Sequence, residues 1–211
     1  LVKIEGLRYY RDAFSTDEQE ELLRILYEHP WQSILARRQQ FYGEVYYHTS
    51  HKNLQLQPTK DSNDSLHSQQ QQQRQPIKQS TNDETQIPIS LPLEALKPYL
   101  QAKCEKFFGD DQGFPSQILI NEYRNNLGIA SHFEDFLAFG PTILTISLIS
   151  PIYMTLKKPK VRCNSCHEYW DIQKIYLEPG SLLVMEGNAR YEYRHGISKY
   201  KWIHFPSKRN I

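Results

Sequence analysis

Hydrophobic and polar residues alternate with two periods along the chain, one helical and one extended. The residues from Ser15 to Glu18 have the spacing of a capping box, in which a serine and a glutamate three positions later satisfy free backbone N–H groups. An apolar stripe at helical spacing follows, formed by Leu22, Leu23 and Leu26. We therefore predict a helix to about Glu28, which His29-Pro30 should end because proline disfavours helical backbone in the preceding residue.

A second helix and a series of short strands are predicted around this first helix. Leucines at helical spacing between Pro88 and Phe108 predict the second helix, with Pro98 near its start. Alternating apolar runs, punctuated by glycine and proline, predict strands at Val2–Tyr10, Gln117–Tyr123, Ile129–Phe133, Thr142–Ser150, Tyr153–Lys157, Asp171–Leu177, Ser181–Met185 and Tyr191–His195. Strands at such short intervals favour a β-sandwich or barrel over repeated βαβ units.

One long polar stretch interrupts this pattern. From Leu56 to Gln86 the sequence is rich in glutamine, serine, asparagine and aspartate, with an uninterrupted glutamine run from Gln69 to Gln73. Such a stretch cannot bury enough apolar surface to fold, so we predict a disordered insert at about 56–86. The whole chain, residues 1–211, is expected to form a single domain that contains this insert, since loop closure costs little even for a long insert.

Composition and charge narrow the class of protein without identifying a partner. The chain has 211 residues, and its 25 lysines and arginines nearly balance 24 aspartates and glutamates, which argues neither for nor against a nucleic-acid partner. Its three cysteines do not make a disulfide framework, so we expect a reducing compartment, cytoplasmic or nuclear. We also expect a monomer. No apolar run is long enough to cross a membrane. Leu1 is not an initiator methionine, so we expect a fragment of a longer chain.

The candidate chemistry lies in the stretch from Asn121 to Asp135, which reads NEYRNNLGIASHFED. In a strand, alternate residues point to the same face, so His132 and Glu134 should point to one place while Asp135 points away. The distal His195, in the sequence YRHGI, would complete a set of two imidazoles and one carboxylate. That set suits Fe(II) and leaves three coordination positions open. Taken alone, the motif His-x-Glu also fits an ordinary solvated strand.

Further motifs place this stretch in a family context. They are Asn121-x-Tyr123, Gly128-Ile129, His132-x-Glu134, Thr145 to Leu148, Gly180 to Met185, and Ala189-Arg190-x4-His195-Gly196-Ile197. Together, from Ile4 to about Ile203 apart from the insert, they resemble the AlkB family of 2-oxoglutarate- and iron-dependent dioxygenases, and most closely its eukaryotic members. The resemblance implies a mainly β fold, a double-stranded β-helix (jelly roll), with N-terminal helices packed on it.

The same resemblance assigns a metal and a reaction. It implies that His132, Glu134 and His195 are catalytic and bind Fe(II). The implied reaction consumes O2, decarboxylates the co-substrate 2-oxoglutarate to succinate, and hydroxylates a carbon of the substrate. A hydroxylated N-methyl group then leaves as formaldehyde, so the reaction can be a demethylation. Glu134 departs from the family, in which aspartate is usual at this position.

Three further residues are implied to bind 2-oxoglutarate. Asn121 and Tyr123 match the family pair that hydrogen-bonds the co-substrate, and both side chains can donate to a carboxylate. The family also carries an arginine on a strand after the distal histidine, which forms a two-pronged salt bridge to the far carboxylate. Arg209 is the candidate, although the chain ends at Ile211 and the final strand is therefore expected to be truncated.

A basic and aromatic stretch from Ala36 to Thr49 is a candidate for substrate binding. Arg37, Arg38, Tyr42 and Tyr46 combine charge and rings in a way that suits phosphates and stacked bases. In the family the equivalent stretch is part of a lid over the nucleotide. The alternative is a hairpin whose aromatic side chains pack on the core.

Two other clusters are ambiguous. Cys163 and Cys166, followed by His167, could form half of a zinc site with Cys104 or a free histidine, or could lie in an ordinary reduced loop. A basic run includes Lys157, Lys158, Lys160 and Arg162, and Lys199, Lys201 and Lys208 follow further along the chain. Such a run is either a solvated face or a path for a phosphate backbone.

Two functions therefore stay open from the sequence. The first is a dioxygenase that hydroxylates or demethylates a modified base in RNA or DNA, since an enclosed iron needs a flipped or single-stranded base; a protein side chain is the other substrate class known in the family. The second is a catalytically impaired binding module for nucleic acid or protein, suggested by Glu134 and by the truncated final strand. A third possibility is an interaction protein that acts through its glutamine-rich insert.

Overall fold

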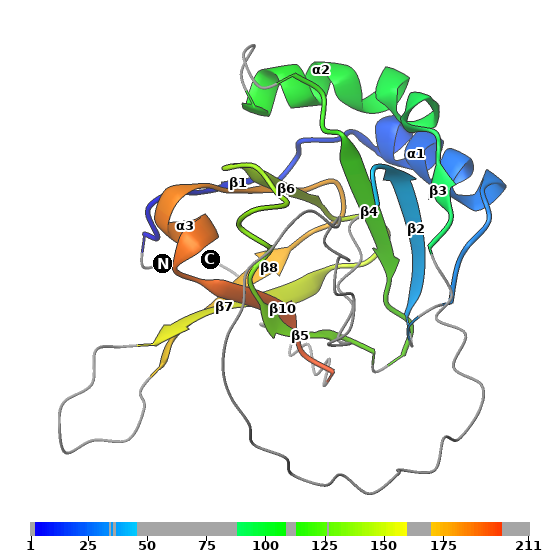
Figure 1. Ribbon diagram of the computed structural model, residues 1–211. Helices are drawn as coiled ribbons and strands as arrows, with labels where there is room; N and C mark the ends of the chain where they lie inside the picture. Colours follow the sequence, from blue (N-terminus) through cyan, green and yellow to red (C-terminus); the bar gives the residue numbers. More distant parts are fainter. Residues whose placement is uncertain are drawn as a thin grey trace, which may run out of the picture. The chain divides into compact units, whose positions relative to one another are not determined.

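The computed structural model describes residues 3–33, 35, 37–45, 88–108, 113–125, 127–159 and 170–199. All of them belong to one of two compact units into which the chain divides, the unit formed by residues 1–46 and 88–211. Three β-sheets and two longer helices make up the described part of this unit (Figure 1). The predicted insert at 56–86 lies outside the described residues.

The three sheets are small, and nearly all neighbouring strands in them are antiparallel. The first has the order β1-β9-β6, with β1 at Leu7–Tyr10, β9 at Leu182–Met185 and β6 at Ile143–Ile146. The second has the order β5-β10-β7-β8, with β5 at Ile129–His132, β10 at Arg194–Ile197, β7 at Ile152–Pro159 and β8 at Trp170–Leu177. The third has the order β3-β2-β4, with β3 at Ser90–Leu91, β2 at Arg38–Gly43 and β4 at Gln117–Glu122.

The first helix, α1 (Thr16–Glu28), begins where the sequence predicts. The Ser15 side chain accepts a hydrogen bond from the Glu18 backbone N–H at 3.2 Å, and the Glu18 carboxylate accepts from the Ser15 N–H at 2.8 Å. The capping box is therefore confirmed, and α1 ends as expected before its cap at His29. Its fully buried residues are Leu22, Ile25 and Leu26, so Ile25 takes the central place that we assigned to Leu23.

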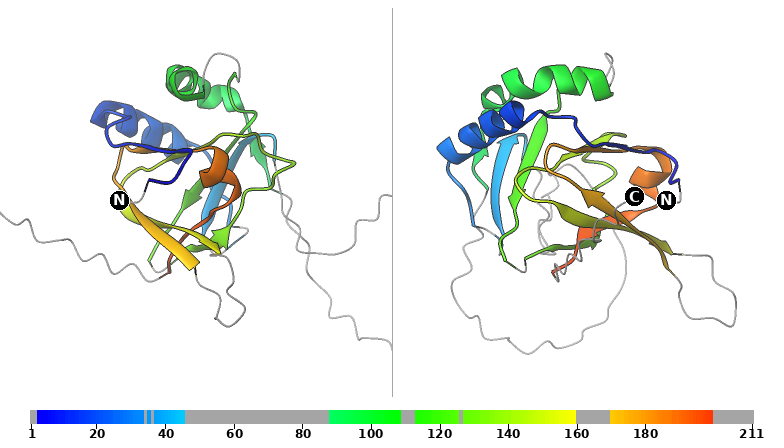
Figure 2. Two further views of the ribbon diagram at one scale, coloured as in Figure 1. Left: turned by 90° about the vertical axis from the view of Figure 1, so that its left-hand side faces the viewer. Right: turned by 180° about the vertical axis from the view of Figure 1, so that it is seen from behind.

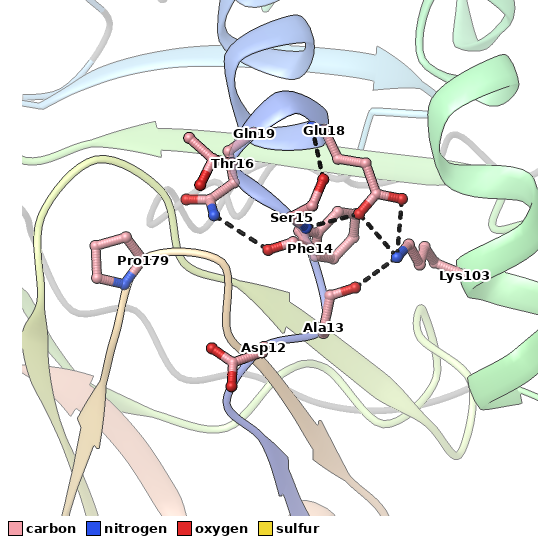
Figure 3. A pocket seen from close by; sticks show the side chains of 9 residues that line it. All are labelled: Asp12, Ala13, Phe14, Ser15, Thr16, Glu18, Gln19, Lys103 and Pro179. Atoms are coloured by element: carbon pink, nitrogen blue, oxygen red, sulfur yellow. Dashed lines mark hydrogen bonds and ion pairs between the residues drawn. The ribbon is translucent and has the colours of Figure 1, made fainter.

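The second helix, α2 (Lys97–Phe108), follows a short 3-10 turn, η1 (Leu93–Ala95), and has Pro98 in its first turn as expected. Lys103 ties α2 to the start of α1, since its ammonium donates to the Ala13 carbonyl at 2.5 Å and pairs with the Glu18 carboxylate at 2.9 Å (Figure 3). A cavity of about 710 Å³ lies around this contact. None of the residues expected to bind iron or 2-oxoglutarate lines it.

Apolar side chains form the core in two main layers. Both helices pack on the β3-β2-β4 sheet around a cluster that includes Leu26, Tyr42 and Leu100 (Figures 1 and 2). The second layer lies between β9 and the inner faces of β7 and β8. Strand β9 faces this second layer with Leu183 and Met185 and a smaller cluster around Phe107 with Leu182 and Val184, and none of its four side chains is more than 1% exposed. Each such side chain contributes about 1.5–3 kcal/mol through burial, so β9 holds the first sheet in place.

Several predicted strands differ from the observed structure at their ends; β6, for example, stops at Ile146 and not at Ser150. The first strand starts at Leu7, because Gly6 adopts a positive φ of 77° and forms a turn before it. The predicted strand Tyr191–His195 is wrong at its start, since a short helix, α3 (Gly187–Tyr191), precedes β10. Its aromatic residues have high strand propensity, but a helical turn is what buries the neighbouring Ala189 and Arg190 together. Among the described residues, no helix is long and apolar enough to span a membrane.

Candidate metal centre

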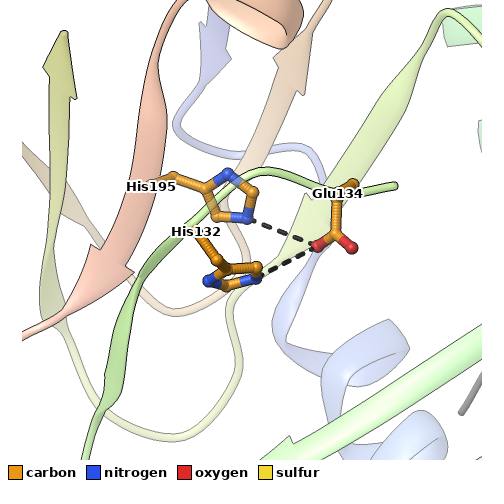
Figure 4. Close-up of side chains that lie close together, drawn as sticks. All are labelled: His132, Glu134 and His195. Atoms are coloured by element: carbon orange, nitrogen blue, oxygen red, sulfur yellow. Dashed lines mark ion pairs between the residues drawn. The ribbon is translucent and has the colours of Figure 1, made fainter. Parts of the chain in front are cut away.

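Two neighbouring strands bring the candidate histidines together. His132 is the last residue of β5 and His195 lies in β10, and the two are directly opposite each other in the antiparallel pair. Their ring centroids are 4.5 Å apart (Figure 4). Directly opposed residues of an antiparallel pair place their side chains on the same face of the sheet. Two histidines 63 residues apart in sequence therefore point to one place.

A β-bulge sets this register. His195 lies opposite His132 while Ile197 lies opposite Ile129, so β5 has one more residue than β10 between the two pairs. The residue of β10 that faces the bulge is Gly196. A Cβ atom built on it would lie 2.8 Å from the Ile129 carbonyl oxygen and 2.8 Å from the Cα and N of Ser131. Only glycine leaves room for the bulge beside the histidine pair.

The carboxylate comes from just beyond the end of β5. Glu134 Oε1 lies 3.5 Å from His132 Nε2 and 3.4 Å from His195 Nε2. The three candidate ligand atoms all lie within 4.8 Å of one another. Adjacent ligands of an ion at roughly 2.1 Å stand roughly 3 Å apart, so these atoms need to move little to bind one. The donor set and its geometry fit an Fe(II) ion held by three ligands on one side, and among the described residues no further histidine, cysteine or carboxylate joins the group.

Electrostatics favour an ionised Glu134. Burial alone would raise its pKa, but the hydrogen bonds and charges of His132 and His195 outweigh burial and hold the pKa well below its usual range. The same pairing with Glu134 raises the pKa of His132, against the opposing effects of burial and of Arg37. His132 Nδ1 lies 2.9 Å from the Ala130 carbonyl oxygen. A proton held there leaves Nε2 as the ligand atom, as is common for metal-binding histidines.

The loop that follows β5 separates Glu134 from its acidic neighbour. Asp135 Oδ1 accepts hydrogen bonds from the backbone N–H groups of Leu137 and Ala138, at 2.7 and 3.0 Å, and so closes the turn of the loop. This contact, and not strand alternation, keeps Asp135 out of the histidine pair. Glu134 itself lies outside the strand, so the shared direction of His132 and Glu134 comes from the loop and not from a continuous strand.

Sequence reasoning missed the residue that fixes this loop. Arg190 of α3 is only 3% exposed, and its guanidinium donates to the backbone carbonyls of Glu134 at 3.0 Å and Asp135 at 3.1 Å. It also stacks over the Phe136 ring, with 5.3 Å between the guanidinium carbon and the ring centroid. From the sequence, Arg190 is only one position of the motif that contains His195. The contact spans 56 residues, so no local pattern could have revealed it.

Two residues of the β3-β2-β4 sheet and Arg37, which precedes β2, form a hydrogen-bonded group that includes a predicted co-substrate residue. Asn121 of β4 accepts through Oδ1 from Arg37 Nε at 2.7 Å and from Gln39 Nε2 at 2.9 Å. Gln39 is 3% exposed and lies opposite Asn121 in the β2–β4 pair. Because both contacts use the amide oxygen, the Asn121 Nδ2 group is the donor that remains for a ligand. Gln39 was not predicted.

Tyr123 and Arg37 are electrostatically coupled to the histidine–carboxylate cluster. Burial raises the pKa of Tyr123, the charge of Arg37 lowers it, and the charge of Glu134 raises it. The charge of Arg37 also acts on His132. Asn121 lies in β4 and Tyr123 follows just after the end of that strand. These charge effects indicate that Tyr123 and Arg37 lie near the candidate ligands.

Two other predicted binding residues have different surroundings. Tyr42 is fully buried in the core under α1, where its hydroxyl donates to Gln40 Oε1 at 3.2 Å. The prediction that Tyr42 binds substrate is therefore wrong, since a side chain with no exposed surface cannot stack on a base. Arg38 forms a two-pronged contact with Glu122, at 2.5 and 2.8 Å, on the helix side of the sheet. Of the two arginines, Arg37 is therefore the one directed toward the candidate site.

Some predictions fall outside the described residues. They are Tyr46, Arg209, the cysteines at 163 and 166 with His167, and the basic residues at 160, 162, 201 and 208. Cys104 is described; it is buried in the core beneath the helices, and burial raises the pKa of its thiol to about 11. A thiol so placed is a poor partner for a zinc site.

Comparisons with known proteins agree with this geometry. The model of a family described as the 2OG-Fe(II) oxygenase superfamily matches residues 6–209. An uncharacterized protein, L905, of Acanthamoeba polyphaga mimivirus is 25% identical over 98% of this chain and 79% of its own length. The tRNA (carboxymethyluridine(34)-5-O)-methyltransferase ALKBH8 of Mus musculus is 38% identical over 42% of this chain, but the match spans only 12% of that protein.

Two further comparisons concern alkB homologues. The mitochondrial alpha-ketoglutarate-dependent dioxygenase alkB homolog 7 of Mus musculus is 32% identical over 49% of this chain and 44% of its own length. The solved structure of OsALKBH1 superposes with a TM-score of 0.53 over 94% of this chain and 87% of that one, at 15% identity. This structural likeness, with the mainly β architecture, confirms the predicted double-stranded β-helix.

Proposed function

Because this chain belongs to the 2OG-Fe(II) oxygenase superfamily and is of AlkB type, we propose that it oxidises a modified base of a nucleic acid, by hydroxylation or oxidative demethylation. The enzyme class and its requirements follow from the family: it is a dioxygenase that uses Fe(II) and 2-oxoglutarate. The observation that carries the proposal is the convergence of two imidazoles and one carboxylate within 4.8 Å.

The described residues divide into three roles in this proposal. His132, Glu134 and His195 hold the Fe(II) ion, which together with 2-oxoglutarate and O2 supplies the oxidising chemistry. Asn121, through its Nδ2 group, and Tyr123, through its hydroxyl, donate to a carboxylate of 2-oxoglutarate. Arg37, fixed by its 2.7 Å hydrogen bond to Asn121, adds a cation for an anionic group of the co-substrate or substrate. Arg209 remains the proposed clamp for the far carboxylate.

The choice of a nucleic acid over a protein substrate is supported by two lines of observation. The ALKBH8 relative of Mus musculus is named for a tRNA nucleotide, and a relative of Arabidopsis thaliana is named as an alkylated DNA repair protein. The candidate centre lies beside a cationic side chain, Arg37, that suits a phosphate. An enclosed metal centre can act on a base only when that base is unpaired or flipped out of a duplex.

Turnover with matched substrates tests the proposal. Succinate and formaldehyde would be measured with single-stranded RNA and DNA oligonucleotides that carry N-methylated bases, with their unmethylated counterparts, and with an N-methylated peptide. We expect the methylated oligonucleotides to raise succinate formation above the unmethylated ones, and His132→Ala to reduce it to background. Stimulation by the peptide alone would overturn the substrate class, and unchanged turnover in His132→Ala would overturn the ligand assignment.

A further inference from the structure

The outer face of the β5-β10-β7-β8 sheet carries an unusual set of side chains. Strand alternation divides this sheet into two faces. On the inner face, Met154, Leu156 and Leu177 are buried in the core, and His195 lies opposite Leu156. The other face, which we call the basic-aromatic face, carries Lys157, Lys174, Arg194, Tyr153, Tyr176 and Trp170.

Strand register fixes the membership of this face. Tyr153 lies opposite Tyr176, and Lys157 lies between Arg194 on one side and Ile172 on the other. Lys174 lies opposite Thr155, two residues from Lys157 along β7. Directly opposed residues share a face, so the three cations and the three rings are on one surface. The basic run found in the sequence is thereby divided, because Lys158 points the other way and pairs with Glu192 at 2.8 Å.

The three cations have no acidic partners among the described residues. Arg194 and Lys157 are directly opposite on adjacent strands, an arrangement of like charges that destabilises a sheet. Of the described strand positions on this face, none carries an aspartate or a glutamate. Lys174 and Arg194 are exposed. A structural role would favour a neutralising carboxylate here, so this arrangement favours an anionic partner.

The rings of this face are positioned beside its cations. Lys157 Nζ lies 4.9 Å from the centroid of the Trp170 ring, and the Arg194 guanidinium carbon lies 5.4 Å from that of Phe133. The rings of Tyr153 and Tyr176 are 5.0 Å apart. None of the three rings on the face belongs to a core cluster of the described residues, and Ile172 between them is 54% exposed. In Figure 1 both α1 and α2 lie over β2 and β4, away from β7 and β8.

We propose that the basic-aromatic face binds a single-stranded nucleic acid, with its phosphates on Lys157, Lys174 and Arg194 and its bases stacked on the rings. Cations interleaved with aromatic rings are the usual composition of a single-strand binding surface. An acidic polypeptide would satisfy the cations but would give the rings no planar partner. This surface is on the opposite side of the sheet from His132 and His195, so binding there does not depend on the proposed reaction.

The test compares the full chain with two variants of the face. Binding of a labelled single-stranded uridine oligonucleotide would be followed by fluorescence anisotropy across a range of salt concentrations. The triple variant Lys157→Gln, Lys174→Gln, Arg194→Gln should bind at least tenfold more weakly at low salt and should reduce the salt slope by about two, since each phosphate contact contributes about 0.7 for single strands. The double variant Tyr153→Ser, Tyr176→Ser should bind the oligonucleotide roughly tenfold more weakly, with an unchanged salt slope.

Matched controls make the outcome decisive. The triple variant Lys3→Gln, Lys97→Gln, Lys106→Gln removes the same charge from exposed positions elsewhere and should keep the wild-type affinity. Equal losses of affinity in this control and in the triple variant of the face would overturn the proposal. Polyglutamate that displaces the labelled oligonucleotide as well as unlabelled oligonucleotide does would also overturn it. Succinate formation without nucleic acid reports the iron centre and should be the same in all variants. If the wild type forms no succinate, the proposed function is contradicted, but the binding result still tests the basic-aromatic face.

Discussion

Single residues show how the candidate centre tolerates a departure from its family. Glu134 is one methylene longer than the usual aspartate, but it lies beyond the end of β5 and reaches back to both imidazoles, at 3.4 and 3.5 Å. Its position is therefore set by the backbone of the loop and not by the strand. Arg190 holds that backbone through the carbonyls of Glu134 and Asp135. Its planar fork can donate to both carbonyls at once, which a lysine ammonium cannot do in the same geometry.

Loss of this contact should weaken metal binding. We expect Arg190→Met to reduce the affinity for Fe(II) by about 10- to 100-fold, the usual effect of removing a group that orients a ligand. Arg190→Lys should restore little of the loss. Fe(II) titrations measure the effect, and Arg194→Met, an exposed neighbour in β10, is the matched control. Equal affinity in Arg190→Met and the wild type would show that the loop needs no such support.

At the scale of elements, the β5–β10 pair determines the alignment of the two histidines. The bulge in β5 is possible because Gly196 has no side chain to meet Ser131 and the Ile129 carbonyl. Without the bulge, the register on one side of it would shift by one residue. A one-residue slip moves a side chain to the opposite face of the sheet.

Gly196→Ala should therefore affect both stability and the metal centre. The new methyl group would lie 2.8 Å from three backbone atoms, which must move apart. We expect the free energy of unfolding to fall by about 1–3 kcal/mol, as for other overpacked sites, together with a loss of Fe(II) affinity. Thermal denaturation and Fe(II) titration measure the two effects. Gly140→Ala is the control, because a Cβ there meets nothing within 4 Å; similar behaviour of the two variants would contradict the role of the bulge.

For the whole molecule, local patterns predicted the elements better than their contacts. The capping box of α1 follows from a short spacing, whereas Glu134 meets His132 through the loop after β5 and not through the strand alternation that the sequence suggested. The short helix α3 could not be recognised, because Tyr191 at its end and Tyr193 just after it favour a strand. The contacts of Arg37 with Asn121 and of Arg190 with Glu134 span 84 and 56 residues, so only the assembled fold reveals them. Tyr42 was misplaced for the same reason, since its burial depends on α1.

The central claim is that His132, Glu134 and His195 form an Fe(II) site that accepts 2-oxoglutarate. The most direct test is the visible charge-transfer absorbance that appears when 2-oxoglutarate is added to the anaerobic Fe(II) protein. The account predicts a band in the wild type and in His29→Ala, a histidine that lies at the end of α1, and no band in His132→Ala or His195→Ala. A band that persists when both His132 and His195 are replaced would contradict the account.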